Sequence, residues 1–464
     1  MDYDVLILGG GIVGCAVAYE LSKYSLNIAL IEKEYDIAND VALINSSVVY
    51  DGVECETTLL SRLESMGNSI IRNIASKFNI NFSKKGYLVL SDNESSEEEL
   101  NKLYNRALDR GIKNIYLLNQ KETLKIEPNL NTKVRKSIYS KNVGIISPYD
   151  LAISYGEIAF DNGVNFKLEE EVLDIQSMSK GFKVVTNKNK FTCSVVLNTT
   201  PKENYSIDNI NMASIKKGYI NYFLIENIGN RYNNNSVISA LEKNNGRIYI
   251  IPTDNNGLMV EITTNSKISY EDGLQIIKKY IGEIDENNIN IFYESRYYND
   301  DNIIDDSLID KGYIKVIEKH RGQITMTPAI SKIVCETIVN NLKCIPKKDF
   351  IDKRREFYRF RDMTNDKRKE IIKLNKKYGK IVCYCEKVTE GEIIDAIRRP
   401  LGARTIEGIK RRTGATFGNC RGAQCLYKVS SILSRETNKN MTDIVKNSKN
   451  SKIILGRIKE FDEI

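Results

Sequence analysis

Histidine is almost absent from this sequence, which has one, His320, among its 464 residues. A single histidine excludes metal sites built of several imidazoles and any mechanism that needs two histidines. Redox chemistry on a bound cofactor is compatible with this scarcity, because the cofactor performs the difficult step. The sequence also lacks any apolar run approaching the ~20 residues that span a bilayer. We therefore expect contact with a membrane only at its surface or through a partner.

Cysteine, charge and length limit the remaining possibilities. Nine cysteines in a chain of this length do not form a disulfide framework, and no signal peptide is recognisable before the apolar run at residues 3–8. We therefore expect a reducing, cytoplasmic location. The net charge of +7 is modest and is spread over many lysines, which indicates a solvated surface and no nucleic-acid partner. The length exceeds that of one hydrophobic core, so two or three domains are expected.

Two close pairs of cysteines lie near the C-terminus, Cys383-Tyr-Cys385 and Cys420-Arg-Gly-Ala-Gln-Cys425. Four thiolates from two loops can enclose a soft metal centre, because sulfur ligands favour iron–sulfur clusters and zinc. The residues between the pairs predict two helices that hold the loops close together. Structural zinc pairs are usually spaced C-x2-4-C, so the C-x-C spacing favours an iron–sulfur cluster. Zinc is the main alternative, and two unrelated pairs of free cysteines are the other.

The N-terminus has the pattern of a dinucleotide-binding site. The required order of strand, glycine turn, helix, second strand and acidic residue is found at residues 4–8, 9–14, 15–23, 27–31 and 32. Gly9 permits the tight turn, Gly11 lets the backbone approach a pyrophosphate, and Gly14 lets the helix pack on the strand. Glu32 can accept hydrogen bonds from ribose hydroxyls, which argues against the 2′-phosphate of NADP. The glycines alone leave FAD and NAD open.

The middle of the chain differs in pattern from its ends. Alternating apolar residues at 219–225, 247–251 and 258–263 predict an antiparallel sheet with one covered face. The apolar positions of residues 57–78 follow a helical period and predict a helix that packs on a core. Residues 346–379 are dense in charge, and we interpret them as a connector to the C-terminal cysteine domain.

These motifs together resemble one family of flavoproteins. The C-terminal stretch closely resembles the bacterioferritin-associated-ferredoxin-like [2Fe–2S] domain that ends some flavoprotein dehydrogenases, and by this resemblance Cys383, Cys385, Cys420 and Cys425 ligate the cluster. The glycine motif at the N-terminus resembles that of the glycine-oxidase and glycerol-3-phosphate-dehydrogenase family, which implies FAD. Over nearly its full length the chain resembles FAD-dependent glycerol-3-phosphate dehydrogenase, specifically the anaerobic large subunit with its C-terminal [2Fe–2S] domain.

The resemblance implies an α/β fold with an N-terminal Rossmann-like FAD-binding domain, an inserted α+β antiparallel-sheet substrate domain and a small helical C-terminal [2Fe–2S] domain. The FAD-dependent oxidoreductase region is expected at 1–345, a charged connector at 346–379 and the [2Fe–2S] domain at 380–464. Within the first region, nucleotide-binding parts are expected at about 1–78, 144–210 and 296–345. Its substrate-domain parts are expected at about 79–143 and 211–295.

The resemblance also assigns individual site residues. Asn45 and Ser46 match the FAD-binding loop after the second strand, and the backbone of Val172 is expected to face the adenine. Tyr50 replaces the family histidine near the flavin, and Arg296 matches the position of a substrate-binding arginine. We therefore expect Tyr50 and Arg296 on the substrate side. The sequence departs from the family pattern at positions expected to face the isoalloxazine, which are Val41, Ala42, Tyr50, Pro201 and Gln323.

The function implied by the resemblance is a flavin-dependent dehydrogenase. Such an enzyme takes a hydride from a carbon bearing a hydroxyl or an amine, and its electrons pass singly through the cluster to a partner subunit or a quinone. Because a flavin accepts two electrons and a [2Fe–2S] cluster carries one, their pairing implies an electron-transfer chain. Two alternatives remain: a non-catalytic or electron-relay subunit that keeps the nucleotide fold and the cluster, and a zinc-stapled nucleotide-binding protein without redox activity.

Overall fold

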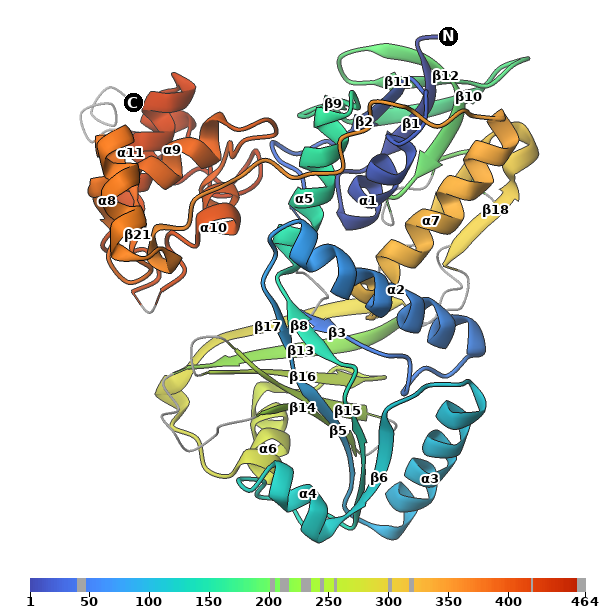
Figure 1. The fold of residues 1–464 in the computed structure, drawn as a ribbon, viewed down its shortest axis with the longest axis vertical. Coiled ribbons are helices and arrows are strands. Elements are labelled where there is room, and N and C mark those ends of the chain that lie inside the picture. Colours follow the sequence, from blue (N-terminus) through green and yellow to red (C-terminus); the bar gives the residue numbers. More distant parts are fainter. Residues whose placement is uncertain are drawn as a thin grey trace.

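The computed structural model describes residues 1–39, 47–200, 205–208, 217–226, 235–242, 246–253, 257–298, 303–316, 321–418 and 420–456. These residues form two large sheets with their helices and a smaller, mainly helical body that contains the C-terminal cysteines (Figure 1). No helix in the described ranges is long and apolar enough to cross a bilayer.

The first large sheet contains the glycine-rich N-terminus. Its parallel strands lie in the order β9-β2-β1-β12-β19. Their bounds are Tyr3–Leu8 for β1, Ile28–Ile31 for β2, Asn165–Lys167 for β9, Lys190–Asn198 for β12 and Tyr313–Val316 for β19. Antiparallel strands extend the sheet at β10 (Val172–Ser177), β11 (Phe182–Thr186) and β18 (Ile304–Leu308). β2 is buried throughout and β1 over its last four residues, as expected for parallel strands covered on both faces.

Four helices pack around this sheet and on one another. They are α1 (Ile12–Leu21), α2 (Thr58–Lys77), α5 (Pro148–Asp161) and α7 (Gln323–Leu342). α1 contacts both α5 and α7, and α2 contacts α7. α1 is buried on nearly every side, which explains why its sequence is apolar except at Glu20. The predicted helix at 57–78 is confirmed as α2, and the side chain of Thr57 accepts a hydrogen bond from the Leu60 amide at its start.

The second large sheet has the order β17-β13-β16-β15-β14-β5-β7-β6 and is antiparallel except between β14 and β5. The strands are β5 (Gly86–Ser91), β6 (Ile115–Asn119), β7 (Lys136–Ser140), β13 (Lys217–Ile225), β14 (Ser236–Glu242), β15 (Gly246–Pro252), β16 (Leu258–Thr264) and β17 (Ile289–Tyr298). The predicted antiparallel sheet is confirmed. A short sheet of β3 (Val48–Val49), β8 (Gly144–Ile146) and β4 (Phe82–Lys84) accompanies it.

Both faces of the second sheet are partly covered, which corrects the expectation of one covered face. Helix α6 (Tyr270–Ile281) packs on one face with apolar residues of β13, β15 and β16. On the other face, α3 (Glu94–Asp109) and the segment that includes Tyr50 pack against β5, β14 and β15. The short α4 (Gln120–Ile126) follows β6 at the far end. The second covered face lies toward the first sheet, where a site can form between the two.

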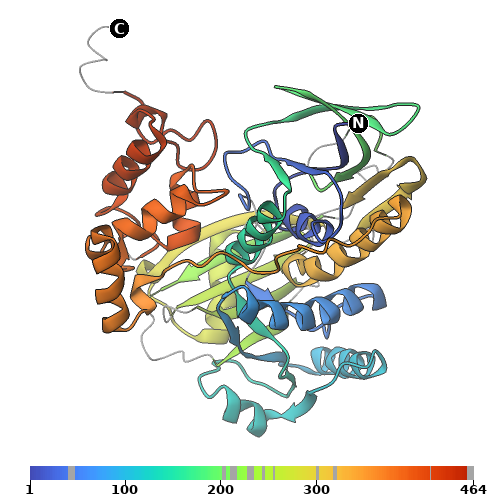
Figure 2. The ribbon, with the colours of Figure 1, turned by 45° about the horizontal axis from the view of Figure 1, so that its top comes forward.

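The C-terminal body has its own core. Its elements are α8 (Asn365–Leu374), β20 (Ile381–Cys383), β21 (Val388–Thr389), α9 (Glu390–Arg398), α10 (Ile406–Thr413) and α11 (Leu426–Thr437). Thr389 forms a capping box with Glu392, and Thr405 caps α10. The two helices predicted between the cysteine pairs are thus confirmed. A long segment after α7 crosses beside α1 and α5 to reach this body (Figures 1 and 2).

Candidate cofactor and electron-transfer sites

The glycine turn between β1 and α1 is shaped by two close approaches. Gly9 has a φ of +102°, and a Cβ there would lie 2.8 Å from Thr199 Oγ1. A Cβ on Gly14 would overlap the Gly9 carbonyl oxygen, so the helix can approach the turn only without a side chain. Gly11 is the N-cap of α1 with an extended backbone and no side-chain cap. The first amides of α1 therefore remain available to an anion such as a pyrophosphate.

Glu32 lies directly beside this turn. Its Oε2 accepts a 2.6 Å hydrogen bond from the Gly10 amide, and its Oε1 accepts one of 2.9 Å from the Glu34 amide. The Glu32 carbonyl accepts from the Glu170 amide at 2.9 Å, which places the start of β10, and with it half-buried Val172, at the same edge of the sheet. The structure thus brings Gly9, Gly14, Glu32 and Val172 together. The predicted Asn45 and Ser46 lie outside the described residues, as do Val41, Ala42, Pro201 and His320.

Tyr50 is buried where the two large sheets meet. Its amide donates a 3.0 Å hydrogen bond to Oγ1 of Thr325 in the first turn of α7. The guanidinium of Arg321, just before that helix, lies 4.5 Å from the Tyr50 ring centroid and 3.7 Å from the Tyr249 ring centroid. Gln323 is the first, buried residue of α7. A cation between two aromatic rings is held in a fixed position by their faces.

A row of polar residues crosses the second sheet beneath Arg321. In adjacent strands Tyr249 pairs with Glu261, Glu261 with Tyr222, and Tyr222 with Tyr293. Arg321 Nε lies 3.7 Å from Oε1 of Glu261, which is fully buried. The Tyr222 hydroxyl is buried without a hydrogen-bond partner in the described chain, and burial raises the pKa of Tyr222 well above its usual range. An unsatisfied buried hydroxyl beside a buried ion pair is typical of a site that takes a polar ligand.

Arg296, the other predicted substrate residue, lies elsewhere. It is exposed and stacks on Tyr219 with 5.2 Å between guanidinium and ring centroid. Tyr219 is three residues from Tyr222 on β13, and alternate residues of a strand point to opposite faces. The structure therefore does not bring Arg296 to Tyr50. Sequence reasoning missed Arg321 and Glu261, although a charged residue within the apolar run of β16 was a usable signal.

Two more buried carboxyl groups adjoin this region. Glu54 accepts hydrogen bonds from the Tyr87 hydroxyl, Ser239 Oγ and Arg247 Nη1. Burial alone would raise the pKa of Glu54, but Arg247 and Arg321 hold that pKa below its usual value. For Glu64, burial dominates and raises the pKa to about 7. Glu64 can therefore exchange a proton near neutral pH.

The four C-terminal cysteines converge as two pairs, each with one thiol from either loop. Cys385 Sγ and Cys420 Sγ lie 3.5 Å apart, and Cys383 contacts Cys425 by a side-chain hydrogen bond. In the described residues no three His, Cys, Asp or Glu side chains are placed to hold a single ion. A [2Fe–2S] cluster is held by four thiolates on two irons. Two separate pairs of thiols fit this requirement better than they fit the single tetrahedral site of a zinc ion.

The surroundings of the thiols differ between the two pairs. Cys383 and Cys425 are buried, whereas Cys385 is exposed and Cys420 partly so. Backbone amides of Gln424, Gly422 and Ala423 lower the pKa of Cys420, while burial, with Cys383 beside it, raises the pKa of Cys425 to about 12. The remaining cysteines, Cys15, Cys55, Cys193, Cys335 and Cys344, lie outside this body.

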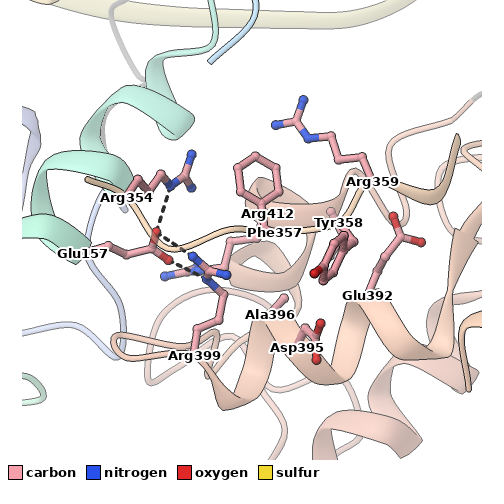
Figure 3. Close-up of a pocket in the computed structure, with 11 residues that line it drawn as sticks. Glu157, Arg354, Phe357, Tyr358, Arg359, Glu392, Asp395, Ala396, Arg399 and Arg412 are labelled. Carbon is pink, nitrogen blue, oxygen red and sulfur yellow. Dashed lines mark hydrogen bonds and ion pairs between the residues drawn. The ribbon is translucent and has the colours of Figure 1, made fainter. Parts of the chain in front are cut away.

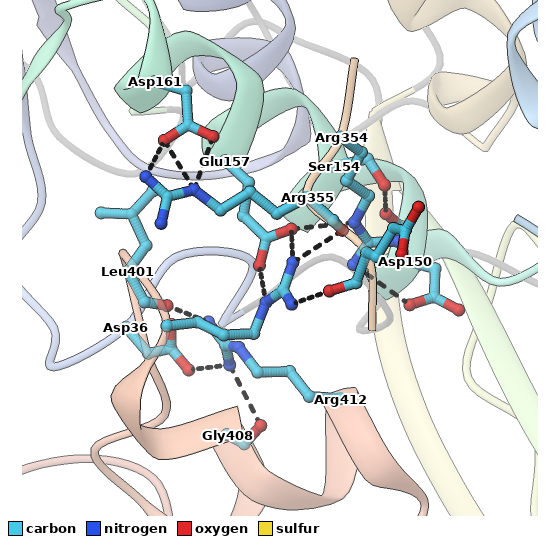
Figure 4. A network of polar contacts seen from close by, with 12 residues as sticks. Asp36, Asp150, Ser154, Glu157, Asp161, Arg354, Arg355, Leu401, Gly408 and Arg412 are labelled. Carbon is cyan, nitrogen blue, oxygen red and sulfur yellow. Dashed lines mark hydrogen bonds and ion pairs between the residues drawn. The ribbon is translucent and has the colours of Figure 1, made fainter. Parts of the chain in front are cut away.

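The C-terminal body is joined to the first sheet by a buried ion pair. Arg412 of α10 donates to both oxygens of Asp36 at 2.6 and 2.7 Å, and each side chain is at most 5% exposed. Arg411 Nη1 donates to Asn39 Oδ1 at 3.0 Å. The edge of the first sheet beside the glycine turn and Glu32 is called the nucleotide edge below. Asp36 follows Glu32 by four residues, so the C-terminal body holds the segment that leaves this edge (Figure 4). Sequence reasoning missed this pair, because nothing local marks either residue.

A second ionic contact lies on α5. Glu157 accepts from Arg399 Nε and from Arg354 Nε, each at 2.8 Å (Figure 3). Burial would raise the pKa of Glu157, but Arg399 and Arg354 hold it below its usual value. Arg399 belongs to the C-terminal body and Arg354 to the crossing segment, so one carboxylate joins three parts of the chain.

Known proteins match both halves of this arrangement. A family model described as FAD dependent oxidoreductase matches residues 4–337, and one described as BFD-like [2Fe-2S] binding domain matches residues 381–435. Glycerol 3-phosphate dehydrogenase of Caloramator mitchellensis is 33% identical over 482 residues, covering 98% of this chain and 99% of that protein. Glycerol 3-phosphate oxidase of Mycoplasma pneumoniae is 31% identical over 196 residues, covering 41% of this chain and 51% of that protein.

Solved structures share the fold. The dithionite-reduced L-alpha-glycerophosphate oxidase of Mycoplasma pneumoniae with FAD bound gives a TM-score of 0.67 at 22% identity, covering 77% of this chain and 99% of that one. Glycine oxidase of Geobacillus kaustophilus gives 0.61 at 18% identity, with coverages of 77% and 99%. These likenesses confirm the expected fold class. The two family matches confirm the expected cofactors, FAD and a [2Fe–2S] cluster.

Proposed function

This chain belongs to the FAD-dependent oxidoreductase family, and we propose that it is a dehydrogenase that oxidises a small hydroxy or amino substrate, with glycerol 3-phosphate the first candidate. When bound, FAD supplies the hydride acceptor, and the cluster supplies a carrier of single electrons. The electrons leave to a partner subunit or a quinone. We expect the protein to work in the cytoplasm, with membrane contact only through a partner.

The attachment of the cluster body to the nucleotide edge carries this proposal. Arg411 and Arg412 bind residues 36–39, which follow the acidic end of β2. The Thr416 amide donates a hydrogen bond to the Cys425 sulfur. Thr416 follows Arg412 by four residues, which span at most ~14 Å. The path from Arg412 to Cys425, a proposed cluster ligand, is therefore short. A cluster held this close to the segment that binds FAD is suited to receive electrons from the bound flavin.

The proposed nucleotide site rests on the glycine turn and its neighbours. We propose that the amides after Gly11 bind the pyrophosphate, that Glu32 binds the ribose and that the Val172 backbone contacts the adenine. Gly9 and Gly14 give the turn its shape. Asn45 and Ser46 remain predicted contacts in the loop that follows. Cys383, Cys385, Cys420 and Cys425 are the proposed cluster ligands.

The substrate end is assigned to the junction of the two sheets. We propose that the Arg321 guanidinium binds an anionic group of the substrate and that the Tyr50 and Tyr222 hydroxyls bind its other oxygens. Tyr50 holds the substrate and does not act as the base, because a phenol is protonated at neutral pH. Arg296 keeps its predicted role only if the substrate reaches the outer strand β17.

Anaerobic spectroscopy of the protein with both cofactors tests the proposal. Glycerol 3-phosphate, a 2-hydroxy acid or an amine should bleach the flavin and then the cluster. Cys420→Ser should bleach only the flavin, because that variant lacks a ligand, while Cys344→Ser should behave like the wild type. Cluster absorption without flavin reduction by any such substrate would support the electron-relay subunit. Stoichiometric zinc without iron would support the zinc-stapled protein.

A further inference from the structure

The cluster body exposes aromatic rings beside its most accessible thiol. Cys385 is exposed, while Cys383 and Cys425 are buried in the core of the body. Next to Cys385, the Tyr384 side chain is 62% exposed, and Phe417 is 51% exposed. Electrons that reach the cluster can therefore leave most directly on the side of Cys385, where these rings face solvent.

Contacts place the rings and several cations on one face. Lys428 Nζ lies 5.8 Å from the Tyr384 ring centroid, and Lys410 Nζ lies 5.4 Å from that of Phe417. Gly418, next to Phe417, approaches Cys385 so closely that a Cβ would overlap that of Cys385, and its carbonyl accepts from the Arg421 amide at 2.7 Å. We name five residues the cluster rim: Tyr384, Lys410, Phe417, Arg421 and Lys428.

The rim carries a positive charge that the protein does not neutralise. Residues 410–428 contain five lysines and arginines and no aspartate or glutamate. Two of these cations, Arg411 and Arg412, are paired with Asp36 and are not part of the rim. Lys410 lies 3.5 Å from Glu407, but Arg421 and Lys428 form no ion pair with any carboxylate of the described chain. The nearby carboxylate of Glu386 is already paired with Arg361 at 2.6 Å.

We infer that the cluster rim is the docking surface for an acidic electron-carrier protein that is reduced at the cluster. Exposed lysines and arginines around an electron exit attract a negatively charged partner and orient it, and tyrosine, phenylalanine and arginine are enriched at protein interfaces. The inference rests on the proposed function. Oxidation of one substrate releases two electrons and two protons: the protons pass to solvent, and each of two carrier molecules takes one electron.

An anionic membrane would attract the same cations, but of the five rim residues just Tyr384 and Phe417 have rings that could insert into one. The apolar residues Val429, Ile432 and Leu433 of α11, the helix that presents Lys428, are turned into the core of the body. A surface helix that binds membranes instead needs its apolar face free. The geometry therefore favours a protein partner over a lipid surface.

Charge reversal at the rim tests the inference with the full-length protein carrying both cofactors. The protein is reduced chemically, so that the test does not depend on a substrate, and is mixed with an acidic ferredoxin or, separately, with a small uncharged quinone. Lys428→Glu and Arg421→Glu should each slow ferredoxin reduction about tenfold at low salt, with the effect shrinking as salt is added. Reduction of the quinone should be unchanged. Lys121→Glu on α4, far from the rim in Figure 1, is the control.

Three results would overturn the inference. Rates with ferredoxin that match the Lys121→Glu control would show that the rim does not bind the carrier. Equal losses with both acceptors would show damage to the cluster and not to docking. Binding to phosphatidylserine vesicles that the rim variants abolish, with ferredoxin reduction unchanged, would assign the rim to a membrane. Failure of every substrate to reduce the flavin would instead count against the proposed function.

Discussion

Removing the Arg412 guanidinium should release the cluster body from the nucleotide edge. Arg412→Met keeps most of the aliphatic stem but leaves Asp36 buried, with Arg411 still paired to it at 3.4 Å. Breaking a buried ion pair from one side costs about 3–5 kcal/mol. Because Arg411 compensates part of the lost charge, we expect about 3 kcal/mol, and about 1.4 kcal/mol corresponds to a tenfold change in an equilibrium. Release of the body should become more than about a hundredfold more frequent.

Arg412 also bonds within its own body, which must be separated from docking. It donates to the carbonyl oxygens of Leu401 and Gly408 at 2.6 and 3.0 Å. Asp36→Asn approaches the same pair from the other side, and the double variant completes a mutant cycle whose coupling energy reports the pair itself. Arg355→Ala is the matched control, since Arg355 binds Asp161 at the same junction but is 53% exposed. An exposed pair of this kind should cost at most about 1 kcal/mol.

Two measurements test whether Arg412→Met releases the cluster body. Urea unfolding is monitored by flavin fluorescence for the first sheet and by visible circular dichroism for the cluster, and stopped-flow absorbance gives the rate of cluster reduction after the flavin. Arg412→Met should separate the two unfolding transitions and slow cluster reduction, while flavin reduction by substrate keeps its rate. If Arg412→Met costs no more than Arg355→Ala and cluster reduction is unchanged, the Asp36 pair does not hold the electron path together.

Three other predictions use separate parts of the molecule. In the folded protein the pKa of Glu64 is raised to about 7, so Glu64 keeps a proton that the unfolded chain releases at lower pH. Its contribution to stability therefore falls as pH rises from about 4.5 to 7. Glu64→Gln should stabilise the protein by up to about 3 kcal/mol at pH 8 and by little at pH 5, measured by thermal unfolding. Gly14→Val should abolish FAD retention, because its side chain would strike the Gly9 carbonyl, whereas Gly379→Ala, with ordinary contacts only, should retain FAD in a flavin-content assay. Tyr50→Phe should raise KM with a loss of rate that is constant over about pH 6–8, and Tyr50→His should add an ionisation near about pH 6.5 to the rate profile; a single ionisation there in the wild type would refute the role given to Tyr50.

The sequence alone determined the features whose signals are local. The glycine turn depends on Gly9 and Gly14 at fixed spacing because only residues without Cβ fit that turn, and the apolar runs of β1 and β2 follow from burial on both faces. The helices between the cysteine pairs were predicted because Thr389 and Thr405 stand at their starts, where a side-chain oxygen can bind a free amide. The helix α8 within the charged stretch was missed, since its buried side is reduced to Ile371.

Only the tertiary structure decided which distant residues meet. Asp36 and Arg412 are 376 positions apart, and neither is distinguished in sequence from the other charged residues of the chain. The row from Tyr249 through Glu261 to Tyr222 depends on strand register, because a shift of one residue would turn each side chain to the other face. The same register turned Arg296 away from Tyr50, while the end of β19 and the start of α7 placed Arg321 there. The spacing of the cysteines in the sequence identified the four candidate ligands. The packing of α9 and α11 decided that Cys383 and Cys425 are buried and Cys385 is exposed.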